Sequence, residues 1–213
     1  MNNSCFHSTV IAFVAVSASG QIVVYDFTGE PGDQASTAAT INAANLTAAA
    51  VSRGSGLNAA NATGSINSSG WTTGTSLDAN DYYGWSLTPA DGYSLNLTEI
   101  RFTERRSASG ILSWELRSSL DGFASAVGSA TVPDNESTRT QTVSLDSSFS
   151  GIAATVEFRL YGFNAESAAG TWRLSGASGL EVYGSVVPEP HEYAALAGLG
   201  LLGFAVWRRS RRA

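Results

Sequence analysis

The residues that carry most enzymatic and metal chemistry are missing from the central part of this chain. Between Gln21 and Val186 there is no His, Cys, Lys or Met. A Ser-His-Asp or Cys-His arrangement, a zinc site built on His or Cys, and a Lys Schiff base are therefore excluded there. The sequence also lacks a GxxxxGK[ST] phosphate loop and a Gly-rich strand–helix unit for a dinucleotide. What remains is the chemistry of carboxylates, hydroxyls, arginines and aromatic rings.

Carboxylates alone would suffice for one class of enzyme, because glycosidases need only two carboxyl groups across a cleft. The glutamates that could supply such a pair are Glu99, Glu104, Glu115, Glu157 and Glu166. We interpret them instead as solvated charges on strand faces, balanced by Arg117, Arg159 and Arg173. A carboxylate-based glycan hydrolase is therefore the third of three functional hypotheses, and we predict a chain that is not an enzyme.

Oxygen ligands for calcium occur at close spacing in the stretch "SLDANDYYG", as Asp78, Asn80 and Asp81. Calcium takes carboxylate and amide oxygens, and loops of a β-sheet protein can present them. Asp and Asn also favour turns, because their side chains hydrogen-bond to their own backbone. We expect no obligatory cofactor and retain calcium as a candidate ligand of these three residues.

A third surviving chemistry is sugar binding, because flat aromatic side chains stack on sugar rings and the jelly roll is a common lectin scaffold. Trp85, Trp114 and Trp172 alternate with polar residues and are expected in the core. The candidate glycan contacts are the aromatic residues in polar settings and the arginine pair of "TERRSASG": Trp71, Tyr82, Tyr161, Arg105 and Arg106. The arginines would suit an acidic polysaccharide.

Charge and cysteine content exclude further classes. The chain of 213 residues has a net charge of −6, and from Gln21 to Val186 eight arginines face 16 acidic residues, a net of −8. Binding to a phosphate backbone needs a basic surface, so we expect no nucleic-acid partner. The single cysteine is Cys5, so the central part holds no disulfide.

Strand patterns recur along the central part, and "ILSWELRSS" and "TVEFRLYGF" both alternate apolar with polar residues. One-sided alternation is typical of antiparallel sheets with one face toward water. We therefore predict an all-β chain, an antiparallel β-sandwich that is jelly-roll-like, over residues 21–186. The alternation slips between Leu97 and Ile100, which predicts a β-bulge near Thr98 or Glu99. A strand is expected near Leu46–Arg53, followed by a long surface loop over residues 54–74.

The N-terminal segment is predicted to be a secretory signal peptide over residues 1–20. It has a short apolar run, "VIAFVAV", followed by the small residues "SASG". A buried first strand is the alternative.

The C-terminal tail, residues 187–213, holds 15 uncharged residues from Tyr193 to Trp207. As a helix these would reach about 22 Å, whereas a bilayer core is about 30 Å thick. The expected membrane segment is carried by Tyr193, Leu196, Leu199, Leu201, Leu202, Phe204, Val206 and Trp207. The basic residues behind it, expected to stay cytoplasmic by the positive-inside rule, are Arg208, Arg209, Arg211 and Arg212. Such a short span suits a transient stop in the membrane, and an ordinary tail anchor is the alternative.

The sequence Val187-Pro188-Glu189-Pro190, then an apolar stretch, then "RRSRR" closely resembles the PEP-CTERM sorting signal of Gram-negative bacteria. The resemblance implies export through the Sec translocon, passage through the inner membrane, and cleavage near Pro-Glu-Pro by an exosortase-type enzyme. The stretches "LRSSLDGFAS" and "EFRLYGFNAESAAGTWRL" resemble the β-sandwich ectodomains of such proteins. That resemblance implies a protein of the cell surface or extracellular matrix.

These observations predict an exported protein whose sandwich has a structural or adhesive, non-enzymatic role. The alternative is a carbohydrate-binding module for extracellular polysaccharide.

Overall fold

The protein folds into two β-sheets with almost no helix. The computed structural model describes residues 20–189, 204 and 207–211, so the predicted signal peptide falls almost entirely outside the described residues. The all-β class and the antiparallel character predicted from alternation are confirmed, since every strand pair except β2 with β8 is antiparallel.

In the described part of the chain the first sheet has the strand order β2-β8-β15-β10-β16-β1-β4, with β13 beside β10 and β7 beside β8. Its strands are β1 (Gly20–Tyr25), β2 (Pro31–Gly32), β4 (Ile41–Asn42), β7 (Asn58–Ala59), β8 (Ser65–Ser69), β10 (Tyr93–Arg106), β13 (Arg139–Ser144), β15 (Trp172–Ser175) and β16 (Leu180–Pro188).

The second sheet has the order β12-β11-β14-β9-β6-β3, with β5 beside β9. Its strands are β3 (Ser36–Thr37), β5 (Leu46–Ala48), β6 (Val51–Arg53), β9 (Tyr82–Pro89), β11 (Ser113–Ser118), β12 (Ala126–Thr131) and β14 (Val156–Phe163). Two 3-10 turns, η1 (Ser119–Asp121) and η2 (Ser147–Phe149), follow β11 and β13.

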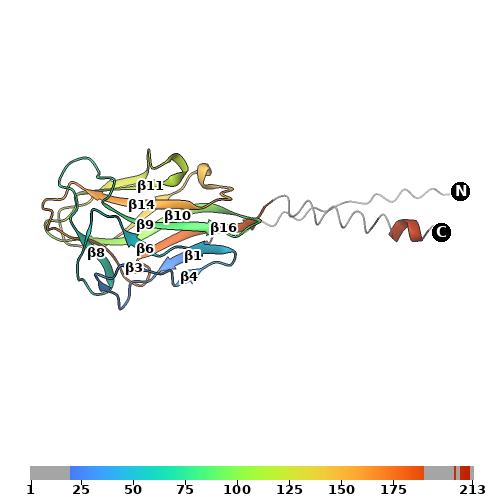
Figure 1. Ribbon diagram of the computed structural model, residues 1–213, viewed down its shortest axis with the longest axis horizontal. Coiled ribbons are helices and arrows are strands. Elements are labelled where there is room, and N and C mark those ends of the chain that lie inside the picture. Colours follow the sequence, from blue (N-terminus) through green and yellow to red (C-terminus); the bar gives the residue numbers. More distant parts are fainter. Residues whose placement is uncertain (1–19, 190–203, 205–206, 212–213) are drawn as a thin grey trace.

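The two sheets pack face to face as a β-sandwich (Figure 1). Aromatic rings meet across the interface: Phe102 of β10 lies edge-on to Trp114 of β11 with ring centroids 5.0 Å apart. The predicted core positions Trp85, Trp114 and Trp172 are buried, at 3% exposure or less. Burial of alternate residues from both sheets supplies the hydrophobic stabilisation of the fold.

Local expectations had mixed outcomes. The register of β10 against β16 shifts between Leu97 and Glu99, which confirms the predicted bulge. Strands β5 and β6 confirm the strand expected near Leu46–Arg53. The surface loop expected over residues 54–74 is wrong, because β8 lies there between β2 and β15 with four of its five residues buried.

The last strand runs past the expected end of the domain. β16 continues to Pro188, where Val187 and Pro188 pair with Ser94 and Tyr93 of β10. Val187 and Pro188, the first two residues of the expected sorting motif, therefore belong to the sheet. Pro190 and most of the expected membrane segment lie outside the described residues, but Phe204 and residues 207–210 are helical. Within residues 20–189, 204 and 207–211, no helix combines the length and apolar character needed to cross a membrane.

Candidate binding surface at the far end of the sandwich

The sandwich has two distinct ends, which are set by the long strand β10. At one end Tyr93 pairs with Pro188, close to where β1 begins at Gly20 opposite Gly184. At the other end Arg106 pairs with Trp172. These two ends of β10 are separated by 13 residue steps, or roughly 40 Å. The chain enters and leaves the sandwich at the first end (Figure 1), which we call the exit end, and the other is the far end.

Trp71, expected on the surface, is instead fully buried at the far end. Its ring packs edge-on against Tyr83 and Trp172, with centroids 5.4 and 5.3 Å apart, and its Nε1–H donates to the Ser68 carbonyl at 2.8 Å. Gly162 makes room for the ring, because a Cβ there would lie 2.8 Å from it. The prediction that Trp71 contacts a glycan is therefore wrong, since no ring face is open to solvent.

The two tyrosines predicted on polar strand faces do meet, with ring centroids 5.5 Å apart. Tyr161 is only 3% exposed, so its expected exposure is wrong, whereas Tyr82 is half-buried. The guanidinium of Arg159 lies over the Tyr82 ring at 4.6 Å and over the Phe123 ring at 4.0 Å. Arg159 thus occupies a ring face of Tyr82 that a sugar would need for stacking.

The predicted calcium ligands line a hollow of about 420 Å³ at the far end, together with glycines and threonines. Asp78 accepts the backbone N–H of Asn80 at 2.8 Å, and Asp81 accepts that of Thr72 at 2.8 Å. Burial and the nearby charge of Asp78 raise the pKa of Asp81. The described residues contain no group of three or more His, Cys, Asp or Glu side chains that could hold a metal. The bond of Asp78 is the one expected of a turn residue, whereas Asp81 ties the start of β9 to the segment at Thr72, nine positions earlier.

The predicted arginine pair is divided between the two faces of its strand, as successive strand residues must be. Arg106 points into the sandwich and is 1% exposed. It forms ion pairs with Asp134, at 2.9 Å, and with Glu166, and donates to the carbonyls of Ser107 and Ala108. Arg106 is therefore a structural residue, and the expectation that it contacts a glycan is wrong.

Arg105 points outward and lines a small polar pocket of about 180 Å³ at the far end. The lining residues are Arg105, Arg106, Ser107, Glu136, Thr171 and Arg173. Arg105 donates to the Glu136 carboxylate at 3.1 Å. Sequence reasoning treated Arg173 only as a balancing charge. The alternation of "GTWRLSG", in which Trp172 and Leu174 face inward, is the sequence signal that could have placed Arg173 on the outer face.

Arg173 and Arg105 are direct cross-strand partners in the β15–β10 pairing. Burial lowers the pKa of Arg173, the positive charge of Arg105 lowers it further, and Glu136 partly offsets both. The far end thus holds two outward arginines in one pocket against one carboxylate. This arrangement can donate hydrogen bonds to hydroxyl or carboxylate oxygens.

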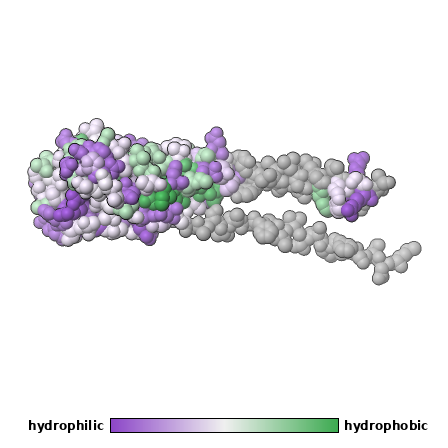
Figure 2. All heavy atoms as spheres, turned by 90° about the horizontal axis from the view of Figure 1, so that it is seen from below, coloured by the Kyte–Doolittle hydropathy of each residue, from purple (hydrophilic) through white to green (hydrophobic). Residues whose placement is uncertain are grey.

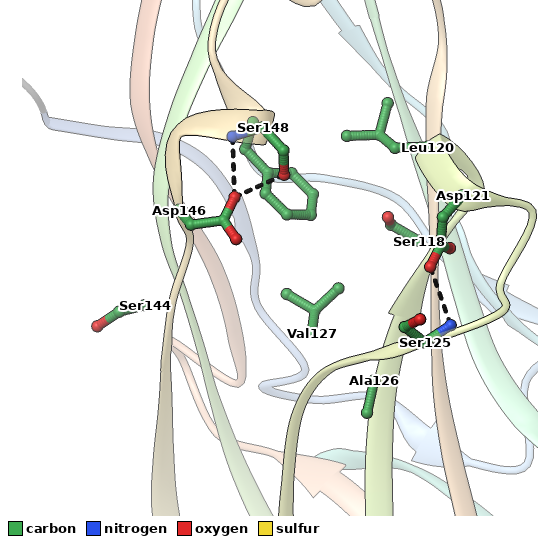
Figure 3. A pocket seen from close by; sticks show the side chains of 10 residues that line it. Ser118, Leu120, Asp121, Ser125, Ala126, Val127, Ser144, Asp146 and Ser148 are labelled. Atoms are coloured by element: carbon green, nitrogen blue, oxygen red, sulfur yellow. Dashed lines mark hydrogen bonds between the residues drawn. The ribbon is translucent and has the colours of Figure 1, made fainter.

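A second pocket, of about 300 Å³, lies nearer the exit end between η1 with β12 and β13 with η2 (Figure 3). Asp121 and Asp146 lie on opposite sides of the pocket, with Val127 between them in Figure 3, and Phe149 also lines it. Sequence reasoning missed both aspartates, although each occurs in the tripeptide "SLD", at 119–121 and 144–146, which is also found at 76–78.

The two aspartates do not form an acid–base pair. Loss of water contact raises the pKa of Asp121, but N–H donors of Ser125 and Ala124 outweigh this and lower it. Hydrogen bonds from the Ser148 side chain and backbone N–H lower the pKa of Asp146. A glycosidase needs one carboxyl group that keeps its proton. Neither aspartate meets that need at neutral pH.

The five glutamates considered for catalysis are all engaged within the fold. Glu115 and Glu157 pair with Arg117 at 2.6 Å and with Arg159 at 2.7 Å, which agrees with their interpretation as balanced strand-face charges. Glu99 and Glu166 also pair with arginines. Glu104 differs from the expectation of a solvated charge, because it is fully buried.

No family model and no curated protein matches this chain. Among solved structures it is similar to a family 29 carbohydrate-binding module from Piromyces equi, at 10% identity and a TM-score of 0.43, covering 79% of this chain and 93% of that one. It is also similar to the K3 adhesin domain of Lys-gingipain from Porphyromonas gingivalis, at 12% identity and a TM-score of 0.38, covering 78% and 99%. A third similar structure is the Stig cyclase Fisc from Fischerella, at 11% identity and a TM-score of 0.33, covering 80% and 100%.

Proposed function

We propose that this chain is an exported, non-enzymatic adhesive protein whose sandwich binds extracellular polysaccharide through its far end. The observation that carries the proposal is the placement of both ends of the domain at the exit end, with the arginine pocket at the opposite end of β10. A domain attached through its exit end presents its far end to the surroundings. Figure 2 shows a largely hydrophilic and neutral surface at that end, and a hydrophobic patch nearer the exit end.

The C-terminal tail supports export and sorting within this proposal. Its resemblance to the PEP-CTERM signal indicates the Sec translocon and an exosortase-type enzyme as partners, with transient residence in the inner membrane and delivery to the cell surface or matrix. The strip enters the tail directly from β16, where the N–H of Glu189 donates to the Gly92 carbonyl at 2.8 Å. We keep the jelly-roll-like description of the sandwich as part of this proposal.

Carbohydrate is the preferred partner because the far-end pocket is polar and rich in N–H donors. Polysaccharides present many hydroxyl and carboxylate acceptors, whereas the net charge of −8 from Gln21 to Val186 opposes a phosphate backbone. A hydrolytic role is disfavoured because hydrogen bonds lower the pKa of both aspartates of the pocket nearer the exit end.

Two measurements test the proposal. An epitope tag inserted in the exposed far-end segment at Thr75–Ser76 should be labelled by antibody on intact cells of the native host. The purified full-length chain, held in detergent, should co-sediment with the extracellular polysaccharide of that host. Labelling that requires cell lysis would overturn display at the surface, and absence of co-sedimentation would overturn the adhesive role.

A further inference from the structure

Arg105 and Arg173 lie directly opposite each other in the β10–β15 pairing, with two positive charges on the same outer face. Like charges directly opposite each other in a sheet are destabilising. In the described part of the chain, no hydrogen bond or ion pair is made by the Arg173 side chain, although a guanidinium carries five N–H donors. The neighbouring Arg106 needs no further anion, because Asp134 and Glu166 already pair with it.

Glu136 partly fills the place of an anion in this pocket. Its carboxylate accepts from Arg105 at 3.1 Å and from the backbone N–H of Ala108 at 3.1 Å. The Glu136 side chain is 51% exposed, so an incoming ligand can reach the same donors. Two outward arginines against one glutamate leave one unbalanced positive charge. The pocket therefore already holds the carboxylate of Glu136, and its remaining positive charge can attract a second carboxylate.

The size and lining of the pocket limit what it can hold. Its volume of about 180 Å³ equals that of roughly six liquid waters, which suits one acidic group with part of a sugar ring. Ser107 and Thr171, which both carry a hydroxyl, also line the pocket. Ser107 Oγ accepts the Thr171 N–H at 2.8 Å, so its own proton is available to a ligand oxygen.

We infer that Arg105 and Arg173 form an anion subsite that binds the carboxylate of an acidic polysaccharide, with Ser107 and Thr171 facing the hydroxyls of the same sugar. The planar guanidinium matches a carboxylate in a two-point geometry, and Glu136 shows that a carboxylate fits among these donors. The inference names the ligand class for the adhesive role and rests on that proposal for its biological setting.

The test uses the full-length chain and two probes, an α-1,4-linked galacturonic acid trimer and its fully methyl-esterified form, in which each carboxylate is replaced by a neutral methyl ester. The acid trimer should bind more tightly than the ester. Arg173→Gln should weaken binding of the acid trimer about tenfold or more, which corresponds to the loss of about 1.4 kcal/mol. Arg101→Gln, which removes the same charge elsewhere on the same sheet face, should change the affinity less than twofold.

Glu136→Gln provides the reciprocal test, because it removes the carboxylate that competes for Arg105. This variant should raise the affinity for the acid trimer several-fold. It tests the subsite even if the Arg173→Gln variant fails to fold. Equal binding of the acid and ester trimers, or equal losses in the Arg173 and Arg101 variants, would overturn the subsite. Tighter binding of a sulfated trimer than of the acid trimer would overturn the carboxylate assignment. If the subsite fails these tests but the chain still co-sediments with the host polysaccharide, the adhesive role is supported without the subsite.

Discussion

The Nε1–H of Trp172 donates to the carboxylate of Glu104 at 2.9 Å, and both side chains are fully buried. The other carboxylate oxygen accepts from Arg139 at 3.4 Å and from Gln141 at 3.3 Å. The glutamate therefore links β15 to β13 from its position on β10. A charge can remain in this interior because a paired, hydrogen-bonded carboxylate avoids most of the cost of lost hydration.

Replacing Glu104 should be among the most destabilising single changes in this domain. Glu104→Ala strands a buried indole N–H and removes the carboxylate that pairs with Arg139, so we expect a loss of about 3 kcal/mol or more in the free energy of unfolding. Glu104→Gln should cost less, because an amide oxygen still accepts from Trp172. Urea denaturation measures both, with Glu115→Ala as the control, since its partly exposed ion pair with Arg117 on the outer face of the sheet contributes about 1 kcal/mol or less. Equal effects at the two sites would contradict the assigned role.

Asp81→Asn should stabilise the fold at neutral pH. Burial and the charge of Asp78 raise the pKa of Asp81 in the folded chain. The folded state therefore holds this proton more tightly than the unfolded chain does, and ionisation costs stability above the unfolded value of about 3.9. The amide oxygen of Asn can still accept the Thr72 N–H. The melting temperature of the variant should exceed that of the parent at pH 7, and the advantage should fade near pH 3.

The control for this prediction is Asp78→Asn, which removes the repelling neighbour and should also raise the melting temperature at pH 7. A lower melting temperature for Asp81→Asn at pH 7 would show that the ionised carboxylate stabilises the fold. Repeating the scan with calcium tests the retained calcium hypothesis, since a ligand of the folded state must raise the midpoint.

Arg53→Lys should be strongly destabilising although it conserves charge. The half-buried guanidinium of Arg53 donates to the Asn67 carbonyl and Ser68 hydroxyl of β8 at 2.8 Å each. It also donates to the Gly32 carbonyl at 2.5 Å and to that of Gln34. One ammonium group cannot serve these separated acceptors, so we expect a loss of about 2–3 kcal/mol in unfolding free energy. Thermal and urea unfolding measure it, with Arg101→Lys at a half-exposed ion pair as the near-neutral control.

The same arginine explains why β8 could not be predicted from its sequence. "SINSS" reads as a loop because small polar residues favour turns, yet Ser68 Oγ accepts from Arg53 at 2.8 Å and from Tyr83 at 2.9 Å. Those partners lie 15 residues away in the chain, so no local pattern reveals them. Strands β11 and β14, in contrast, were predictable, because the alternation of apolar and polar residues is visible in consecutive positions and depends on no distant partner.

The candidate site was predictable to a similar, partial degree. The strand-end position of Arg105 follows from alternation, but its pairing with Arg173 depends on strand register and could not be read from the sequence. The burial of Trp71 likewise depends on the absent side chain of Gly162, 91 positions further along the chain. Tertiary contacts of this kind decide which aromatic and charged residues reach solvent.

The pairing of β16 makes a specific prediction for the sorting proposal. Pro188 lies opposite Tyr93 and the N–H of Glu189 donates to the Gly92 carbonyl at 2.8 Å, so the chain is held in the sheet through Glu189. A processing enzyme must bind its substrate strip in an extended, unpaired form. Cleavage should therefore fall after Glu189, the last described residue that is hydrogen-bonded to the neighbouring chain segment at Gly92. The mature protein should retain Pro188 and Glu189. Intact mass measurement of the protein from its native host, with and without the processing enzyme, checks this.

Truncation variants supply the physical control for that measurement. A chain ending at Glu189 should unfold at nearly the same urea concentration as the full-length chain. A chain ending at Val186 should lose about 2 kcal/mol, because it forfeits backbone hydrogen bonds at about 1 kcal/mol each. A mature chain that ends before Pro188 would show that the strand end opens before cleavage, and one that keeps "RRSRR" would refute sorting cleavage altogether. The stability difference between the two truncations decides whether such opening is a barrier to the enzyme.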